Sequence, residues 1–413
     1  MTNNTPPVTS GAQVVASKGF RRHVVVLLLG LVTYFGFAAS INYWMDPWEI
    51  FHPTRYSAAP SWVKTERITL AHNIRNAAPF DVLLLGSSRI RYLVVDGGPR
   101  NPDVSITAPY FGDKNVYNAA LAGSNIYQMR RILEHALHYH PVKEMVLLLD
   151  DVMMNTHRPL GNGWQEFNYY GSPSFQTDLE RWLSLVDFAM LKETAGFILE
   201  AQTKSAQGGA PTSDGLNNVW TSGLGEFTRR DLYGCFEIDA RTRGELDRIL
   251  SIAKEQGIRV TLISSFIHPA LFEYSYRSDN GLSQRNYLTL VRELAIKHQV
   301  PAWLFSPYSA ITSGSPHRSY ALEEFKSSPD FFDPGHANAQ IGRKMLDLAL
   351  KDQASPDLNG YRLNDISMDN LLNELERQRS NRLQKQDILF MDYVKEHPIK
   401  ARQACSTRSE PKL

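Results

Sequence analysis

The stretch Asp81-Val-Leu-Leu-Leu-Gly-Ser-Ser-Arg89 decides the fold of this 413-residue chain. Its four consecutive apolar residues, Val82 to Leu85, are typical of a short strand that is buried on both faces. Gly86 ends the run, and the serines that follow suit a sharp turn into a helix. Such a turn presents a hydroxyl group at the end of a strand, which makes Ser88 a candidate nucleophile.

Further apolar runs alternate with amphipathic stretches along the chain. Strands are predicted at 81–85, 144–149, 258–264 and 300–305, and helices at 124–138, 237–256, 283–298 and 337–350. Strands that alternate with helices predict an α/β fold in which helices cover both faces of a parallel sheet. Ligands of such sheets bind beyond the carboxyl ends of the strands, where we expect Ser88 to lie.

A second candidate group, Asp333-Pro-Gly-His336, lies far downstream. A carboxylate three residues before an imidazole can hold the ring in the tautomer that accepts a proton, so His336 could take the proton of Ser88. The alternative is structural. Asp333 is a good helix N-cap and Pro334 suits the first position of a helix, while Ser88 could equally cap a helix of its own.

The composition excludes several classes of protein. Lys and Arg number 44 against 43 Asp and Glu, so no excess of positive charge favours a nucleic-acid partner. Cys235 and Cys405 form neither a disulfide framework nor a metal motif. Three histidines, His135, His138 and His140, lack carboxylates at metal-binding spacing and are interpreted as a solvated helix end. No cofactor and no metal are predicted.

The N-terminal region predicts a location. Residues 24–41 carry no charge and would cover about 27 Å as a helix, which is close to the hydrocarbon thickness of a bilayer. Basic residues precede this segment and aromatic residues follow it: Lys18, Arg21 and Arg22, then Tyr43, Trp44 and Trp48. This pattern predicts a single-pass inner-membrane protein with a cytoplasmic N-terminus and a periplasmic main domain. A signal peptide cleaved near Ala38–Ser40 and a buried core helix are the alternatives.

The chain is therefore predicted to consist of several parts. These are a cytoplasmic N-terminus (1–23), a transmembrane helix (24–41), an irregular or partly helical connector (42–78), an α/β domain (79–350) and a charged C-terminal tail (351–413) with a helix near 366–395. An insertion at 155–235 begins with aromatic residues, namely Trp164, Phe167, Tyr169 and Tyr170. It is interpreted either as a lid over the site or as a plain helical decoration.

The GSSR turn, the NAALAG segment (Asn118–Gly123) and the DPGH element resemble blocks I, II and V of the SGNH, or GDSL-type, hydrolase superfamily. The resemblance extends over roughly residues 80–350 and is closest to the membrane-tethered branch that takes part in bacterial, alginate-type polysaccharide O-acetylation. It implies a three-layer flavodoxin-like fold, with Ser88 as nucleophile, His336 as base and Asp333 as the acidic member of a triad. The backbone N–H groups of Ser88 and Gly123 would form the oxyanion hole.

The sequence departs from the family pattern at two places. Ser87 stands where the GDS pattern has Asp, and the GxND motif of block III is replaced by DDVMMN after the strand at 144–149. Asn155, the last residue of that stretch, is the remaining candidate for the missing oxyanion donor. Arg89 and His268, which follow predicted strands, are candidates for binding substrate.

The resemblance implies an O-acetyltransferase or acetylesterase that acts on an extracellular polysaccharide without a cofactor. Its partners would be the membrane and a membrane acyltransferase or other component of the exopolysaccharide machinery. The altered block III favours an alternative, a catalytically weak SGNH-fold module that binds glycan or scaffolds such a complex. A third interpretation is a structural envelope component that docks through the helix of the tail.

Overall fold

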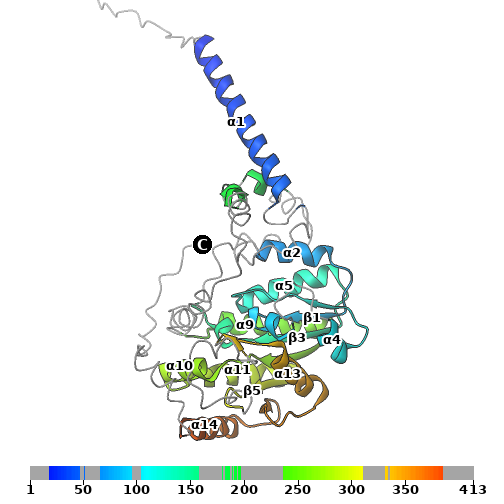
Figure 1. Cartoon of the computed structure of the whole chain (residues 1–413), viewed down its shortest axis with the longest axis vertical. Helices are drawn as coiled ribbons and strands as arrows, with labels where there is room; N and C mark the ends of the chain where they lie inside the picture. Colours follow the sequence, from blue (N-terminus) through cyan, green and yellow to red (C-terminus); the bar gives the residue numbers. More distant parts are fainter. Residues whose placement is uncertain are drawn as a thin grey trace, which may run out of the picture. The chain divides into compact units, whose positions relative to one another are not determined.

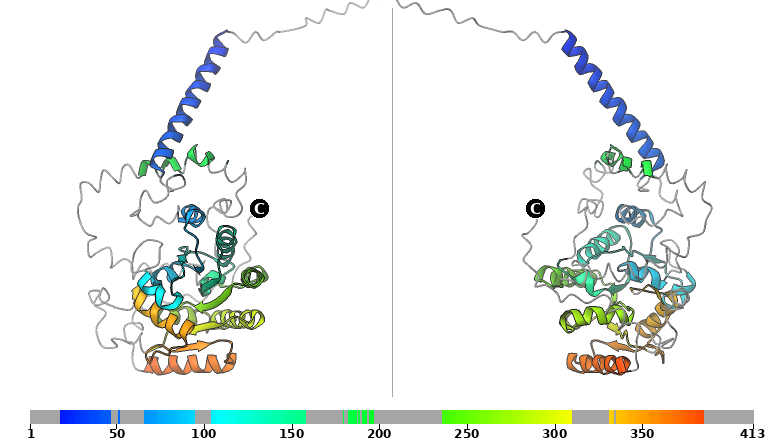
Figure 2. Two further views of the ribbon diagram at one scale, coloured as in Figure 1. Left: turned by 90° about the vertical axis from the view of Figure 1, so that its right-hand side faces the viewer. Right: turned by 60° about the vertical axis from the view of Figure 1, so that its left-hand side comes forward.

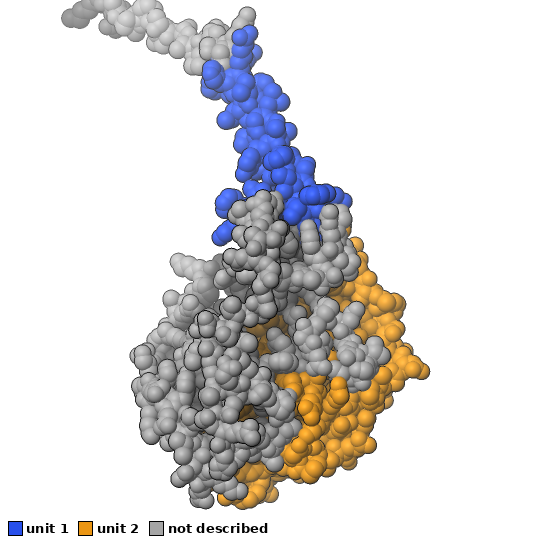
Figure 3. All heavy atoms as spheres, in the orientation of Figure 1, with its two compact units in different colours: residues 1–47, 178–207 blue, residues 48–177, 208–413 orange. Residues whose placement is uncertain are grey.

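The computed structural model describes residues 18–46, 51, 66–94, 104–157, 179, 182–186, 188, 190–192, 194–196, 236–309, 331–333 and 335–384 (Figure 1). The chain divides into two compact units, residues 1–47 with 178–207 and residues 48–177 with 208–413, which Figure 3 shows in different colours. The four aromatic residues of the predicted lid and both cysteines lie outside the described residues.

The larger unit is built on a six-stranded sheet with the order β2-β1-β3-β4-β5-β8. The strands are β1 (Val82–Leu85), β2 (Val116–Asn118), β3 (Glu144–Leu149), β4 (Arg259–Ser264), β5 (Ala302–Phe305) and β8 (Gly360–Arg362). The first five are parallel, and β8 runs antiparallel to β5. The predicted α/β class is therefore confirmed, and the order 2-1-3-4-5 is that of flavodoxin-like folds. The strand order reverses beside β1, whose neighbours are β2 and β3.

Helices cover both faces of this sheet (Figures 1 and 2). One layer contains α2 (Glu66–Asn76), α5 (Ile126–Tyr139), α9 (Ala240–Glu255), α11 (Leu282–His298) and α14 (Met368–Gln384), and the other contains α3 (Ser88–Val94), α4 (Val104–Phe111) and α13 (Ala339–Lys351). Strand β1 contributes Leu83 and Leu85 to the first core and Val82 and Leu84 to the second. All four side chains are 0% exposed, which explains why this strand is apolar throughout.

The apolar pattern did not predict every element. Strands β2 and β8, with three residues each, and helices α4 and α10 (Pro269–Asp279) were missed, whereas α2 falls in the connector that was expected to be irregular or partly helical. Strand β8 and helix α14 lie in the predicted C-terminal tail, yet Leu371 and Leu375 of α14 are buried in the core. The described α/β unit therefore continues to residue 384 rather than ending near 350.

His135 of α5 and His140, the C-cap of this helix, fix α5 against α2. The side chain of His135 donates through Nε2 to the carbonyl oxygen of Ala71 at 2.8 Å, and His140 does the same to that of Ile74 at 2.5 Å. Both imidazoles are buried. The interpretation of this region as a solvated helix end is therefore wrong for these two residues.

Within the described residues, one helix is long and apolar enough to span a membrane. This helix, α1 (Lys18–Met45), contains the apolar segment Phe20–Met45, whose mean hydropathy reaches 2.3. It is longer at both ends than the predicted span. The helix continues without a break through Ala38 and Ser40, and the Ser40 hydroxyl donates to the carbonyl oxygen of Gly36.

We predict that Gly86→Ala destabilises the protein. A Cβ at this position would lie 2.8 Å from the carbonyl oxygen of Leu148 and 3.1 Å from the Leu148 Cβ, so β1 and β3 would have to move apart. Such overpacking costs about 1–3 kcal/mol, which is measurable by urea unfolding of the detergent-solubilised chain.

The matched control is Gly244→Ala in the exposed part of α9, where an added Cβ meets nothing within 4 Å. Since alanine favours a helix over glycine, this variant should gain roughly 0.5–1 kcal/mol. A Gly86→Ala protein as stable as its parent would contradict the close approach of β1 and β3.

Candidate active site

Ser88 lies where β1 ends and α3 begins. Gly86 and Ser87 form the turn, and Ser88 is the first residue of the helix. Ser88 is partly exposed, whereas its neighbours Ser87 and Arg89 are 4% and 5% exposed. Ile90, buried in the core one residue further on, anchors α3. The turn therefore presents one hydroxyl group to solvent from a rigid base.

His336, which is distant in the sequence, lies beside this turn in the structure. It lies in a two-stranded hairpin formed by β6 (Phe331–Asp333) and β7 (His336–Ala337), and β7 packs against α3. Ala337 is 2% exposed and belongs to the same core as Ile90. The Nε2 atom of His336 lies 2.7 Å from the Oγ atom of Ser88, although the two residues are 248 positions apart. The structure thus brings together the hydroxyl and the imidazole that the sequence singled out.

Asp333 is paired directly with His336 in the antiparallel register of β6 and β7. It does not cap the following helix. Helix α13 begins at Ala339, and its N-cap is Asn338, whose Oδ1 accepts the N–H groups of Gln340 and Ile341 at 3.0 and 3.1 Å. The structural alternative, in which Asp333 starts a helix, is therefore wrong, because Asp333 and His336 are paired strand residues that precede the helix.

A buried ion pair lies directly beside the Ser88 turn. The Nη1 atom of Arg89 is 2.7 Å from Oδ1 of Asp150, and the same nitrogen donates to the hydroxyl of Ser265 at 2.9 Å. The Ser87 hydroxyl donates to the other carboxylate oxygen of Asp150 and accepts the N–H of Arg89. Asp150 is 1% exposed. These contacts join the ends of β1, β3 and β4. Through them the Arg89 side chain stabilises the turn that carries Ser88.

A buried tyrosine makes a further link between β3 and β4. The Tyr287 hydroxyl donates to the carbonyl oxygen of Leu149 at 3.0 Å and lies 3.2 Å from the hydroxyl of Ser264. Complete burial raises the pKa of the Tyr287 phenol, although the hydrogen bond with Ser264 acts in the opposite direction. The phenol therefore stays protonated and keeps its role as a donor.

The NAALAG segment runs alongside the Ser88 turn. The N–H of Ala119 donates to the carbonyl oxygen of Leu84 at 2.8 Å, and the N–H of Leu121 donates to that of Gly86 at 3.0 Å. These bonds continue the pairing of β2 with β1 beyond the strands. Gly123 is exposed and has a φ of +64°, a left-handed conformation that glycine adopts without strain.

Asn118, at the start of this segment, is a functional candidate that the sequence motif did not predict. It is 2% exposed, and its Oδ1 accepts the N–H of Ala120 at 3.0 Å. Among the residues that the structure describes, its Nδ2 has no hydrogen-bond partner. A buried amide without an acceptor costs about 1–3 kcal/mol, so its presence beside the Ser88 turn calls for an explanation.

The other two candidates have backbone contacts. Asn155 is 3% exposed, and its Oδ1 accepts the N–H groups of His157 and Glu237 at 3.1 and 3.3 Å. This oxygen ties the end of the 3₁₀ helix η1 (Asp151–Met154) to the segment before α9. His268 is partly exposed, and its carbonyl oxygen accepts the N–H groups of Leu271 and Phe272 at the start of α10.

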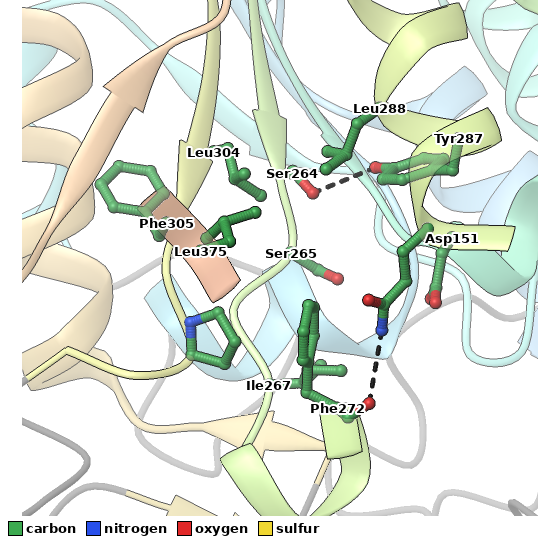
Figure 4. A pocket seen from close by; sticks show the side chains of 12 residues that line it. Asp151, Ser264, Ser265, Ile267, Phe272, Tyr287, Leu288, Leu304, Phe305 and Leu375 are labelled. Carbon is green, nitrogen blue, oxygen red and sulfur yellow. Dashed lines mark hydrogen bonds between the residues drawn. The ribbon is translucent and has the colours of Figure 1, made fainter. Parts of the chain in front are cut away.

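A small cavity opens at the carboxyl ends of β4 and β5 (Figure 4). It is lined by Asp151, Ser264, Ser265, Ile267, Phe272, Gln284, Tyr287, Leu288, Leu304, Phe305, Pro307 and Leu375. Its volume is about 30 Å³, which is enough to hold ordered water. In the part of the chain that the structure describes, no three His, Cys, Asp or Glu side chains are grouped to hold a metal ion.

Comparisons with known proteins add little to this description. No protein-family model matches the chain, and no curated protein matches its sequence. The crystal structure of a "putative acylhydrolase" from Bacteroides fragilis aligns with a TM-score of 0.34 and 12% identity, over 71% of this chain and 96% of that one. A TM-score this low carries no argument about function. A functional assignment therefore rests on the α/β fold and on its Ser88–His336 pair.

We predict that Asp150→Ala strongly destabilises the protein, because it leaves the Arg89 guanidinium buried without its carboxylate. Breaking a buried pair in this way costs about 3–5 kcal/mol. Urea unfolding would measure the loss, and Arg89→Met combined with Asp150→Leu should recover part of it.

Glu293→Ala serves as the control. Its partner Arg243 lies 2.9 Å away, but the two side chains are 47% and 53% exposed, so the change should cost less than about 1 kcal/mol. Equal effects of the two alanine variants would show that the buried pair does not hold the turn.

Proposed function

We propose that this protein is a serine-dependent acyl-transfer enzyme. The observation that carries the proposal is the 2.7 Å separation of Ser88 Oγ and His336 Nε2 at the carboxyl end of β1. In the proposed reaction the Ser88 oxygen attacks an ester carbonyl carbon while His336 takes the Ser88 proton. His336 then protonates the departing alcohol, which leaves an acyl group on Ser88. A second hydroxyl compound or water removes the acyl group by the reverse sequence.

Asp333 is assigned to orient the imidazole. Its direct pairing with His336 in the hairpin supports this role, since residues opposite one another in an antiparallel ladder are close neighbours. A carboxylate on the second ring nitrogen would stabilise the imidazolium that forms when Ser88 loses its proton.

The developing oxyanion needs donors, and we assign three. Two are the backbone N–H groups of Ser88 and Gly123, which the SGNH resemblance implies. The third is the Nδ2 of Asn118 on β2, the strand next to β1, a buried donor for which the described part of the chain offers no acceptor. A substrate oxygen would supply the missing acceptor. Such a donor would compensate for the absent GxND motif.

We assign an O-acetyl group on an extracellular polysaccharide as the substrate, whether it is transferred or hydrolysed. The resemblance to the membrane-tethered SGNH branch supports this assignment, and it also supports a membrane acyltransferase as partner. The span α1 is proposed to leave the α/β unit outside the cytoplasm, because Lys18, Arg21 and Arg22 precede its apolar part. Its unbroken helix through Ala38 and Ser40 supports retention over cleavage.

A second candidate is a glycan-binding or scaffold module with the same fold. The observation that favours it lies in the stretch that replaces block III. In that stretch Asp150 forms an ion pair with Arg89, and the Asn155 Oδ1 accepts hydrogen bonds from backbone N–H groups. Such a module would bind glycan without forming an acyl-enzyme, which a covalent probe can distinguish.

We predict that a serine-directed fluorophosphonate labels the full-length protein in detergent and that Ser88→Ala abolishes the labelling. His336→Ala should slow both labelling and hydrolysis of an activated acetyl ester by roughly 10³-fold or more, since the general base and the nucleophile act as a unit. Mass spectrometry of the labelled peptide identifies the modified residue.

Ser251→Ala in α9 is the control, because this serine is partly exposed and lies on an amphipathic helix away from the motifs. Labelling that persists in Ser88→Ala would reject Ser88 as the nucleophile. A folded parent that takes up no probe would favour the binding module.

The Asn118 assignment has its own test. Asn118→Asp keeps the acceptor for the N–H of Ala120 but replaces the Nδ2 donor with an oxygen. If Nδ2 serves the oxyanion, kcat should fall by about 10²–10³ with little change in KM. A variant that unfolds at the same urea concentration as its parent and retains full kcat would show that Asn118 has a structural role alone.

A further inference from the structure

We propose that part of residues 178–207 inserts into the headgroup region of the membrane beside the end of α1. The inference rests on the proposed membrane span. It concerns the described residues 179, 182–186, 188, 190–192 and 194–196, here called the docked segment, which belong to the same compact unit as α1.

A buried asparagine fixes the docked segment to the last turns of α1. Asn42 is 0% exposed, and its Nδ2 donates to the carbonyl oxygen of Leu185 at 2.7 Å. Its Oδ1 accepts the hydroxyl of Thr194 at 2.7 Å. Both ends of one carboxamide are therefore satisfied by the docked segment, which holds two parts of it against the helix.

Most of the exposed side chains of the docked segment are apolar. Leu185 and Met190 are buried, at 6% and 0% exposure. Trp182, Leu183, Val186 and Phe188 are exposed, with fractions of 58%, 54%, 38% and 77%, and Lys192 is an exposed charged residue of the same segment. A segment that faced water would expose mainly polar groups, so this pattern indicates an apolar or interfacial surrounding.

This exposure is confined to one unit. Among the described residues, the exposed large hydrophobic side chains outside the unit of α1 are Leu282 and Ile296. The remainder lie on α1 or on the docked segment. The larger unit thus buries its large apolar side chains, as expected for a protein in water. The contrast indicates that the smaller unit is surrounded by lipid rather than by water.

The surface of the docked segment continues that of α1. The rings of Tyr43 and Trp182 stack, with centroids 6.5 Å apart and planes 10° apart, and Trp44 beside them is 65% exposed. Tyrosine and tryptophan are enriched at the boundary between headgroups and acyl chains. A lipid surface fits better than a protein groove, because α1 is exposed around its circumference, with 6% of its most apolar window buried.

Spin-label accessibility in liposomes tests the proposal. The full-length protein with Cys235→Ser and Cys405→Ser is reconstituted into vesicles of phosphatidylcholine and phosphatidylglycerol, with a nitroxide on Phe188→Cys. Val26→Cys in α1 and Leu282→Cys in α11 provide the lipid and water references, since these side chains are 68% and 57% exposed. Power saturation then compares collisions with oxygen and with a water-soluble nickel chelate.

We expect the label at 188 to lie about 5–10 Å into the headgroup and acyl-chain boundary, between the two references. A label at Leu183→Cys should give a similar depth. If the label at 188 behaves like that at 282 while the label at 26 is in lipid, the inference is overturned and the span stands. Protection of 188 from both reagents indicates burial by protein and also overturns it. A label at 26 that is open to water rejects the span itself, whatever the outcome of the Ser88 probe.

Discussion

The ion pair between Arg89 and Asp150 is the interaction on which the geometry of the site depends. Removing two charges from water costs several kcal/mol for each, and their attraction offsets this cost when hydrogen bonds satisfy the remaining groups. Here Ser87 and Ser265 provide those bonds. Because the four side chains come from the ends of β1, β3 and β4, the pair fixes the relative position of three strand ends. Ser88, between Ser87 and Arg89 in the chain, has little freedom to move from His336.

The same pair gives a physical account of the two places where the sequence differs from the SGNH pattern that it resembles. Ser87 stands where that pattern has Asp, and the stretch that stands in place of its GxND motif supplies a carboxylate, Asp150. A serine at 87 can donate to that carboxylate, whereas an aspartate there would repel it. The stretch DDVMMN therefore has a structural function at the site. Its role as an oxyanion donor passes, in our proposal, to the Asn118 amide on the opposite side of β1.

How much the sequence predicted depended on the length and continuity of each pattern. Strand β3 was predicted at 144–149 and found at Glu144–Leu149, because six residues between turn signals define a buried strand. Strands β2 and β8 have three residues each, too few for any periodicity, and β8 contains Tyr and Arg in a polar region. Arg89 was interpreted as a substrate ligand because its neighbours in the chain do not reveal Asp150. Asp333 and Asn338 are both good caps, and their position relative to α13 required the structure.

Transfer and hydrolysis share the acyl-enzyme and differ in the compound that removes the acyl group. Water is present at high concentration, so a sugar hydroxyl must be bound and oriented to compete, and such positioning is worth an effective concentration of up to about 10⁵–10⁸ M in the best intramolecular cases. In the proposed mechanism the Ser88–His336 pair would perform the same steps in both reactions. The choice between them must therefore depend on groups that hold the acceptor and exclude water. Changes at Ser88 consequently separate an enzyme from a binding module, whereas changes that weaken acceptor binding separate a transferase from an esterase.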